Sequence, residues 1–188
     1  MVINLKMFLL ATVISLLSGC IFYSNPQINY YDTNQIKSAE LNLEPLALAV
    51  QFRQFRNMTP VGNNFIYSSN SGKQIIDNFN QWIQSPEQMI QRQIVGVLVG
   101  GSDGSSVCDI SGTLYDFAIN PDEQTCTVAL KFNVKVSLDK SMVKEYEYRY
   151  RLTKEVNSTN AANYTVAMAE IVAGITTELH KELKNVLK

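Results

Sequence analysis

The clearest pattern in the chain is an alternation of apolar and polar side chains over residues 125–152. In the first stretch one face is apolar throughout, made of Cys126, Val128, Leu130, Phe132, Val134, Val136 and Leu138. The second stretch places Tyr146, Tyr148, Tyr150 and Leu152 on one face, and Glu145, Glu147, Arg149 and Arg151 on the other. A period of two is typical of strands with one buried face. We therefore predict two neighbouring strands that pack one face against a core.

The same pattern predicts the length of the loop between these strands. A slip of one residue in strand pairing turns every side chain to the opposite face. A two-residue loop would pair Val134 with Glu145 and mix the two faces, whereas a three-residue loop, residues 139–141, pairs Val134 with Tyr146. We therefore predict the three-residue loop.

Shorter strand patterns precede this pair. Residues 46–52 alternate between apolar and polar positions and follow Pro45. Further strands are expected at Tyr30-Tyr31, at 65–67 and 74–76 around a turn with Gly72, and at 109–119, which forms a hairpin with 125–137. The order of these elements places four short strands before the first helix and three longer strands after it.

Two helices complete the expected secondary structure. The first begins at Ser85-Pro86-Glu87-Gln88, where Ser85 caps, Pro86 fits the first helical position and Gln88 returns a bond to the cap; it ends at Gly100-Gly101. The second is a long amphipathic helix from about Thr159 to Leu187. The sequence thus predicts an α+β fold: a single domain with a mainly antiparallel sheet and two helices packed on one face.

The N-terminus has the three-part form of a secretory signal. Lys6 precedes the apolar run Met7 to Leu17, and Ser18-Gly19 stands directly before Cys20. A membrane-spanning helix needs about 20 apolar residues, and this run supplies only about half of that. The ending resembles the lipobox of bacterial lipoproteins, which implies cleavage before Cys20 and acylation of its thiol and new amino end. We expect residues 1–19 to be a signal peptide, 20–29 a lipidated tether and 30–188 the folded domain.

The resemblance also implies a location. In lipoproteins of Gram-negative bacteria an Asp after the lipidated cysteine favours the inner membrane, and this chain has Ile21 there. We therefore expect transfer to the outer membrane, with the domain facing the periplasm. Cleavage leaves 169 of the 188 residues, enough for one domain with its own core.

Charge and cysteine content narrow the partners and the redox chemistry. The cleaved chain has a net charge near −2, which gives no electrostatic reason to expect nucleic acid or anionic lipid. Cys108 and Cys126 fall at opposite ends of the predicted hairpin, roughly 30 Å or more apart, whereas a disulfide needs Cα atoms within about 7 Å. We predict that they stay unbridged, with Cys126 acting as a small core hydrophobe.

Residues that could carry chemistry do not form a recognisable motif. His180 has no ligand or triad partner at helical spacing, so we expect it on the surface. The glycine-rich stretch 100–106 lacks the lysine of a phosphate loop and is interpreted as a connector. The carboxylates have no pairing motif, and no serine lies in a nucleophile elbow. We expect a protein that is not an enzyme and binds no cofactor or metal.

One segment resembles a known family. The stretch Phe79 to Met89 keeps Trp82 and Pro86, but has Gln81 where Arg is usual. Together with Tyr30-Tyr31, the strand at residue 46 onward and the lipobox, it resembles the ABC-type transport auxiliary lipoprotein family. The resemblance implies a non-enzymatic component of an envelope lipid transport system, docking an MCE-domain protein at the outer membrane. It leaves Trp82 and Pro86 as a packing motif or a partner interface.

Other assignments stay open at this point. Small periplasmic lipoproteins of similar layout activate peptidoglycan synthases or act as assembly factors, although a tether of about ten residues favours work close to the membrane. Direct lipid carriage would need a sizeable apolar cavity. The tyrosine stripe at 146, 148 and 150 is either a recognition surface or a sheet face under a helix. A homo-oligomer is also kept among the expected partners.

Overall fold

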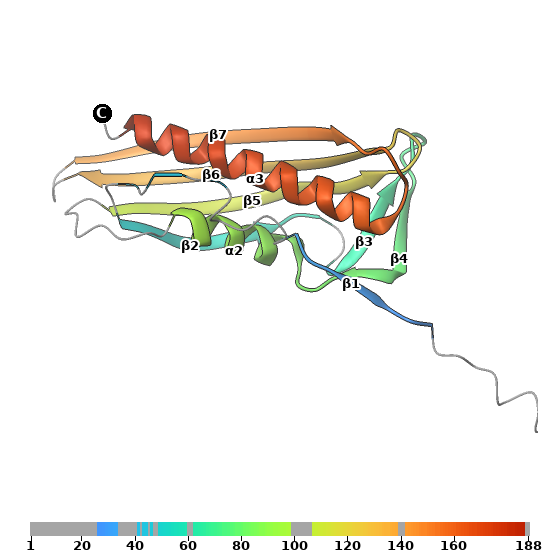
Figure 1. The fold of residues 1–188 in the computed structure, drawn as a ribbon. Helices are drawn as coiled ribbons and strands as arrows, with labels where there is room; N and C mark the ends of the chain where they lie inside the picture. Colours follow the sequence, from blue (N-terminus) through green and yellow to red (C-terminus); the bar gives the residue numbers. More distant parts are fainter. Residues whose placement is uncertain are drawn as a thin grey trace, which may run out of the picture.

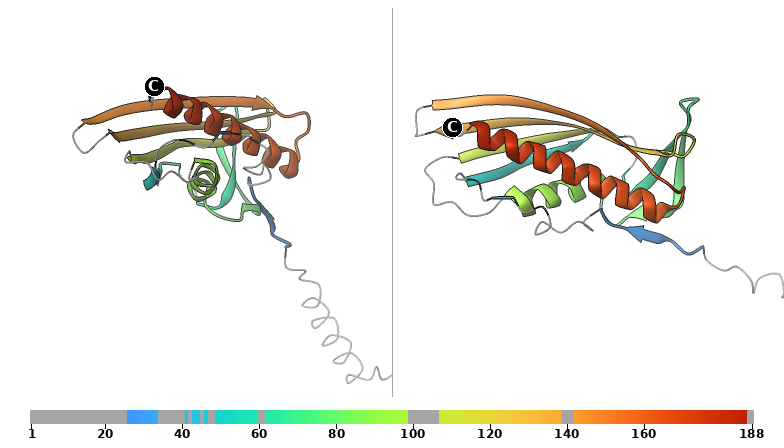
Figure 2. Two further views of the ribbon diagram at one scale, coloured as in Figure 1. Left: turned by 60° about the vertical axis from the view of Figure 1, so that its left-hand side comes forward. Right: turned by 45° about the horizontal axis from the view of Figure 1, so that its top comes forward.

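A computed structural model describes residues 26–33, 41, 43–44, 46, 49–59, 62–98, 107–138 and 142–186. The elements follow in the order β1 (Asn29–Tyr31), β2 (Ala49–Asn57), β3 (Asn64–Ser68), β4 (Gln74–Trp82), α2 (Pro86–Leu98), β5 (Val107–Asn120), β6 (Thr125–Leu138), β7 (Met142–Glu155) and α3 (Ala161–Val186). The strands form one sheet, and both helices lie against the same side of it (Figures 1 and 2). The described part of the chain is therefore a two-layer α+β domain.

The sheet is mixed, and the expectation of a mainly antiparallel sheet is wrong. The described strands form a seven-stranded sheet in the order β1-β4-β3-β5-β6-β7, with β2 also paired to β5. Pairs β1–β4, β2–β5 and β3–β5 are parallel, whereas β3–β4, β5–β6 and β6–β7 are antiparallel. Each antiparallel pair joins strands that follow one another along the chain. Every parallel pair is longer in range, and alternation within a strand carries no information about its direction.

Strand register at the last hairpin is as predicted. Val134 pairs with Tyr146 and Phe132 with Tyr148. The loop residues 139–141 lie outside the described residues, but the register on both sides of them is that of a three-residue connection. Consequently the apolar positions of β6 and the tyrosines of β7 share the face toward the helices.

Two strands differ from the predicted limits. β2 starts at Ala49 and continues to Asn57, beyond the predicted end at residue 52. A bulge between Phe52 and Gln54 interrupts the alternation, so the pattern stops where the strand does not. β4 continues from residue 76 to Trp82 across an irregularity opposite the Asn64–Phe65 step. In both cases the period-two pattern breaks inside the strand, so the sequence signal ends before the strand does.

The helices have nearly the predicted limits. α2 begins at Pro86, and the carbonyl of Ser85 accepts hydrogen bonds from the N–H groups of Gln88 and Met89. The hydroxyl of Ser85 contacts the Glu87 carboxylate, which also accepts a 2.8 Å hydrogen bond from Asn57 Nδ2. These contacts tie the start of α2 to the end of β2. The predicted stop at Gly100-Gly101 lies outside the described residues.

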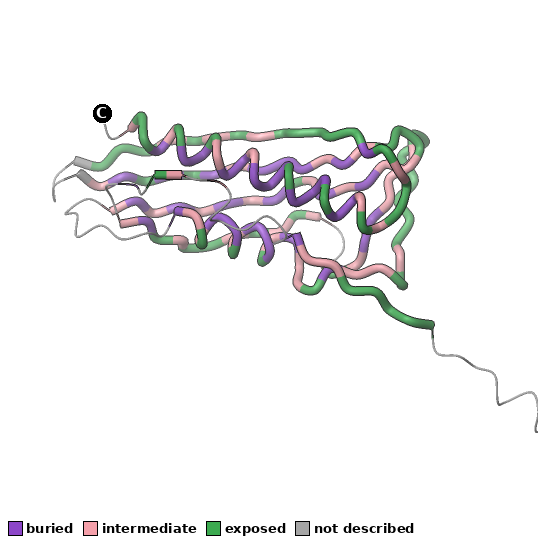
Figure 3. Tube along the Cα trace, in the orientation of Figure 1, coloured by how far each residue is buried: buried purple, intermediate pink, exposed green. Residues whose placement is uncertain are grey.

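The core lies between the helices and the inner face of the sheet. Buried positions run along β5 and β6 and along the sides of α2 and α3 that face them (Figure 3). All apolar positions of β6 from Cys126 to Val136 are buried, as the alternation predicts. Neither of the two described helices covers the opposite face of the same strands.

His180 is buried, so its assignment to the surface is wrong. The side chain is 6% exposed, and Nε2 lies 2.6 Å from the backbone oxygen of Glu44. Lys184, one turn later, pairs with the Glu44 carboxylate. The segment before β2 therefore packs on the C-terminal half of α3. Helical spacing gave no sign of this contact because its partner lies 136 residues away.

The two cysteines of the described domain are free and buried. Cys108 pairs with Val136 and Cys126 with Ile119, at opposite ends of the β5–β6 ladder. Eleven residues along β5 separate these two positions, a distance of about 36 Å at 3.3 Å per residue. A disulfide between them is therefore sterically impossible in this fold.

Candidate functional site

The sheet face away from the helices is a polar surface that extends over four strands. We call it the outer sheet face and define it by the side chains of β2, β5, β6 and β7 that alternate with the core positions. Its principal members are Arg53, Gln54, Arg56, Asp109, Ser111, Thr113, Tyr115, Asp116, Lys131, Asn133, Lys135, Glu145, Glu147, Arg149 and Arg151. The pairing of Ile110 with Val134, both buried, fixes the alternation, because their neighbours Asp109 and Lys135 then point outward.

Ion pairs cross this face from strand to strand. Arg53 Nε lies 2.8 Å from Asp109 Oδ1 between β2 and β5, and Arg151 lies 3.2 Å from Asp116 between β7 and β5. The pairs Lys135–Glu145 and Lys131–Glu147 join β6 to β7, each at 3.2 Å. Partly exposed pairs of this kind contribute little to stability, typically about 0–1 kcal/mol each. Their main effect is to hold charges of both signs in fixed positions on this face.

Glu147 is the most highly connected carboxylate of the outer sheet face. It accepts hydrogen bonds from Arg149 and from Lys131, and these bonds lower its pKa below the usual value. Asp116 behaves differently, because burial raises its pKa and the nearby Arg151 only partly offsets that effect. Both carboxylates are paired with cations, which hold them in position on the face.

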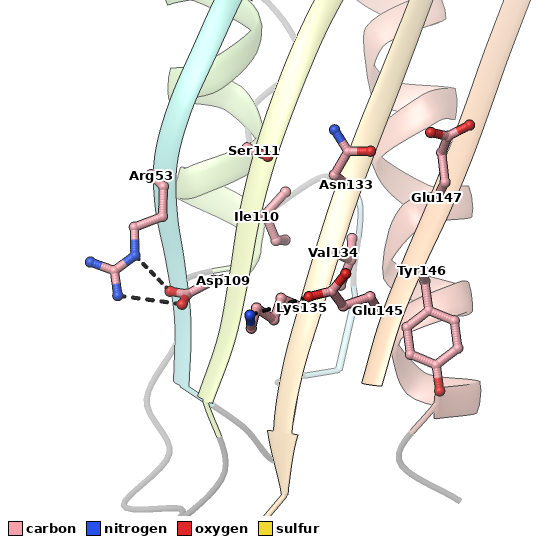
Figure 4. Close-up of a pocket in the computed structure, with 10 residues that line it drawn as sticks. All are labelled: Arg53, Asp109, Ile110, Ser111, Asn133, Val134, Lys135, Glu145, Tyr146 and Glu147. Carbon is pink, nitrogen blue, oxygen red and sulfur yellow. Dashed lines mark hydrogen bonds and ion pairs between the residues drawn. The ribbon is translucent and has the colours of Figure 1, made fainter. Parts of the chain in front are cut away.

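Three shallow hollows lie next to one another on the outer sheet face. The largest, about 540 Å³, is lined by side chains that include Arg53, Asp109, Lys135 and Glu145 (Figure 4). Hollows of about 420 and 400 Å³ follow it, and both are lined by Tyr115 and Lys131. The three hollows are open and are lined by both polar and apolar groups, whereas a small apolar ligand prefers an enclosed site, so they suit the side chains of a protein partner better.

A bulge places Tyr115 between the two smaller hollows. The β5–β6 register shifts between Leu114 and Asp116, which leaves Tyr115 as an extra residue that is exposed on the outer sheet face. Bulges commonly re-aim a side chain in this way. An exposed tyrosine in a field of paired charges is the kind of residue that anchors protein interfaces.

The residues singled out by the sequence lie elsewhere. Cys20 is outside the described residues. Trp82 is 2% exposed, stacks on Phe65 at a centroid distance of 4.0 Å and meets Phe117 edge-on at 5.2 Å. Pro86 is buried at the start of α2. An indole enclosed in this way packs in the core and offers no surface to a partner.

The tyrosine stripe lies on the helix side of β7. Tyr146, Tyr148 and Tyr150 are half-buried and pack against the core, and Tyr146 and Tyr148 stack with their centroids 6.2 Å apart. α3 packs against β7, the strand that carries them. The stripe is therefore mostly a sheet face under a helix.

The loosely clustered carboxylates do not come together. Asp109 and Asp116 belong to separate ion pairs, and Asp122 accepts a hydrogen bond from the Asn70 backbone. Within the described ranges, no three His, Cys, Asp or Glu side chains lie close enough to hold a metal ion. Among the described residues, no helix combines the length and the apolar character needed to cross a membrane.

The sequence alone did not identify the outer sheet face as a site. Its signal was present as the polar half of the alternation in residues 125–152. What the sequence lacked was the parallel pairing of β2 with β5, which brings Arg53 beside Asp109, 56 residues away. Without that pairing the charges of β2 could not be placed on the same surface as those of β6 and β7.

Neither a family model nor a curated protein sequence matches the chain. Its fold does match solved structures. A crystal structure of a protein described only as uncharacterized superposes with a TM-score of 0.56 at 13% identity, covering 86% of this chain and 99% of the other. A Xanthomonas campestris protein of the DUF330 family superposes with a TM-score of 0.55 at 13% identity, covering 82% and 90%. This chain therefore shares its fold with those proteins.

A further match is too weak to support any inference about this chain. The rare lipoprotein B of Shewanella oneidensis gives a TM-score of 0.36 at 10% identity, over 72% of this chain and 93% of that one. The class defined by these observations is an α+β domain with the fold of the DUF330 protein and an exposed, charged sheet face. At identities this low the likeness extends to the fold alone.

Proposed function

We propose that this chain is a non-enzymatic bacterial lipoprotein that docks a partner protein at the outer membrane through its outer sheet face. The observation that carries the proposal is the contrast between the two faces of the sheet. Within the part of the chain that the structure describes, α2 and α3 pack on one face, whereas the other face has no helix over it and is charged and hollowed across β2, β5, β6 and β7. A surface of fixed charges favours specific association over non-specific adhesion.

Anchoring at Cys20 is the second part of the proposal and rests on the lipobox-like ending of the N-terminal segment. Two or more acyl chains make membrane attachment stable, whereas one chain does not. An anchored domain searches for its partner near a surface, so its effective concentration there is high and a modest contact suffices.

The partner that we propose is an MCE-domain protein of an envelope lipid transport system. This part rests on the resemblance of residues 79–89 to the ABC-type transport auxiliary lipoproteins, including the paraquat-inducible lipoprotein of that family. The lipoprotein would hold the far end of the transport assembly at the outer membrane. Any ATPase of the system would be a separate chain.

Site-specific photocrosslinking in intact cells tests the docking face. A crosslinking amino acid at Asn133, which lies exposed on the outer sheet face, is expected to capture an MCE-domain protein identified by mass spectrometry. The matched control places the same group at Glu178 on α3, which is also exposed but lies on the helix layer. Capture of a peptidoglycan synthase from position 133 would instead contradict the transport role, and equal capture from both positions would contradict the assigned face.

The anchor has a separate test. Intact-mass measurement of the protein extracted from membranes is expected to show a triacylated Cys20 as the first residue. A Cys20→Ala strain is expected to lose outer-membrane permeability defence, because the domain would no longer be held at the docking point. An unmodified Cys20, or a strain with normal permeability, would count against anchoring.

A further inference from the structure

An exposed apolar patch lies at the end of the domain where the chain comes from Cys20. It consists of Ile28, Tyr30, Phe79 and Ile83, with exposed fractions of 41%, 63%, 53% and 54%. We call these four residues the β1–β4 patch. Exposed large apolar side chains are ordinary when scattered singly, but a cluster of them marks an interaction site.

Strand pairing brings the four residues together. β1 pairs in parallel with the last part of β4, and Tyr30 lies opposite Gln81. Ile28 lies two positions before Tyr30, and Phe79 and Ile83 lie two positions on either side of Gln81. The backbone N–H of Ile83 donates a 2.8 Å hydrogen bond to the oxygen of Tyr31, which extends the pairing to that residue. Along β1, Tyr30 projects away from Tyr31, which packs against the core, and its pairing partner Gln81 likewise projects away from the buried Trp82. Ile83 lies one residue beyond the end of β4 and is 54% exposed.

The patch is free of charge, in contrast to the outer sheet face. Residues 26–31 and 78–86 contain no charged side chain. Their polar members are amides such as Asn29 and Asn80, whose side chains hydrogen-bond to each other at 3.3 Å. The carboxylates that border these segments have partners of their own: Asp77 accepts hydrogen bonds from the N–H groups of Phe79 and Asn80, and Asp32 pairs with Arg92. The four apolar side chains can therefore contact lipid without burying an unpaired charge. Isoleucine, phenylalanine and tyrosine are also the residue types that settle at the boundary of a bilayer.

The position of the patch along the chain indicates which apolar surface it meets. Ile28 follows Cys20 by eight residues, so a fully extended chain separates them by at most about 28 Å. The first described residues lead directly into β1 at one edge of the sheet (Figure 1). Lipid attachment at Cys20 therefore keeps the β1–β4 patch within one short tether of the bilayer surface, while β7 lies at the opposite edge.

We infer that the β1–β4 patch is a second membrane contact, which inserts its side chains into the interfacial region of the bilayer that holds the lipid anchor. The inference rests on the anchoring at Cys20 proposed above. Two attachment points, one covalent and one formed by the folded domain, would fix the orientation of the domain. The outer sheet face would then be presented at a defined angle rather than on a freely swinging tether.

Spin labels on the full lipidated protein test this contact. Cys108 and Cys126 are completely buried and the thiol of a lipidated Cys20 is blocked, so a cysteine introduced at the surface is the one that reacts. An unlipidated sample is labelled in a Cys20→Ser background. Labels at Ile83→Cys and Tyr30→Cys are examined in vesicles of phosphatidylethanolamine and phosphatidylglycerol. The matched control is Val143→Cys on β7, where the native side chain is 52% exposed. Accessibility to molecular oxygen and to a water-soluble nickel complex is measured at each site.

We expect nickel accessibility at positions 30 and 83 to be at least about fivefold lower than at position 143, with oxygen accessibility raised, because oxygen concentrates in lipid. Equal accessibility at all three positions would overturn the membrane contact. Protection that persists without vesicles and comes with dipolar broadening would assign the patch to a second copy of the chain, and would also overturn it.

Intact mass of the same samples separates this inference from the anchoring proposal. A lipidated protein with freely accessible labels refutes the β1–β4 contact and leaves the lipoprotein intact. An unlipidated protein refutes the anchoring. Labels that become protected when vesicles are added to that protein would still support the contact, and labels that stay accessible would overturn it.

Discussion

Gly112 lies directly beneath the ring of Phe55, where β2 pairs with β5. A Cβ atom at this position would lie 2.3 Å from Phe55 Cε2, far inside van der Waals contact. Phe55 in turn meets Phe132 edge-on at a centroid distance of 6.0 Å. Gly112→Ala is expected to lower the free energy of unfolding by about 1–3 kcal/mol through overpacking. Urea denaturation measures the change.

Two companion variants make this prediction specific. In a Phe55→Ala background the added methyl group meets an emptied site, so its cost is expected to fall well below that in the native background. Gly96→Ala is the control, because a Cβ there touches nothing within 4 Å and the residue lies inside α2. It is expected to stabilise the protein by up to about 1 kcal/mol. Similar losses for Gly112→Ala in both backgrounds would contradict the clash.

The buried thiols carry a prediction about reactivity and pH. Burial raises the pKa of Cys108 and Cys126 from 9.0 to about 12. Neither thiol is expected to react with a thiol reagent at pH 8 in the folded protein, and both are expected to react in urea. Above pH 9 the two thiols lose their protons in the unfolded chain but keep them in the folded protein. The contribution of the thiols to the free energy of unfolding is therefore fully present below pH 9 and falls as pH rises toward 12. Fast reaction of either thiol under native conditions would refute this placement.

At the scale of elements, Asp77 holds the irregular part of β4 that leads to the β1–β4 patch. Its carboxylate accepts hydrogen bonds from the N–H groups of Phe79 and Asn80, from the Asn80 side chain and from the Tyr67 hydroxyl. Burial acts to raise its pKa, but these bonds outweigh burial and lower the pKa below 3.8. The stability that Asp77 contributes is therefore present above about pH 4 and is lost as pH falls through the folded-state pKa.

Asp77→Asn is expected to destabilise the protein at pH 7 by about 1–2 kcal/mol, because an amide replaces the charged acceptor. The difference from the native protein should shrink as pH falls from 7 toward 3, because a growing fraction of the native carboxylate is then protonated. Urea denaturation at the two pH values measures it. An equal loss at both would show that the carboxylate charge has no part in holding this segment.

The elements also show what a sequence can and cannot specify. The β6–β7 register and the start of α2 were predictable because the alternation around Val134 and the Ser85-Pro86 signal are local. The parallel pairing of β1, β2 and β3 was not, since it depends on strands distant in sequence. The burial of His180 and the Arg53–Asp109 ion pair could not be predicted for the same reason. In each case the contacting residue lies far away along the chain. The members of the outer sheet face on β6 and β7 could be predicted from the alternation, whereas those on β2 could not.

At the scale of the whole molecule, the two faces of the sheet are expected to separate stability from docking. The variant Arg53→Ala/Lys135→Ala/Arg151→Ala removes three exposed cations from the outer sheet face. Each ion pair is worth at most about 1 kcal/mol, so the protein should still fold, with only a small fall in Tm. Capture of the partner by the crosslinker at residue 133 should fall strongly, because complementary charge guides association.

The control for this variant is Glu178→Ala/Lys181→Ala, which removes an exposed pair from the helix layer. It should leave both Tm and capture unchanged. Circular dichroism and thermal melts check that every variant is folded before capture is compared. Full capture by the triple variant would mean that the charges of the outer sheet face do not guide docking.

The parallel pairings also set the order in which the domain can fold. Asn29 of β1 meets Asn80 across 51 residues, and among the described strands β2 pairs only with β5, at residues 107–114. Closing loops over such separations costs entropy, and topologies rich in contacts between distant residues fold slowly. A chain exported from its amino end would therefore carry β1 and β2 across the membrane long before they could pair. In a chain that is exported as proposed, the sheet therefore cannot be completed until β5 has emerged.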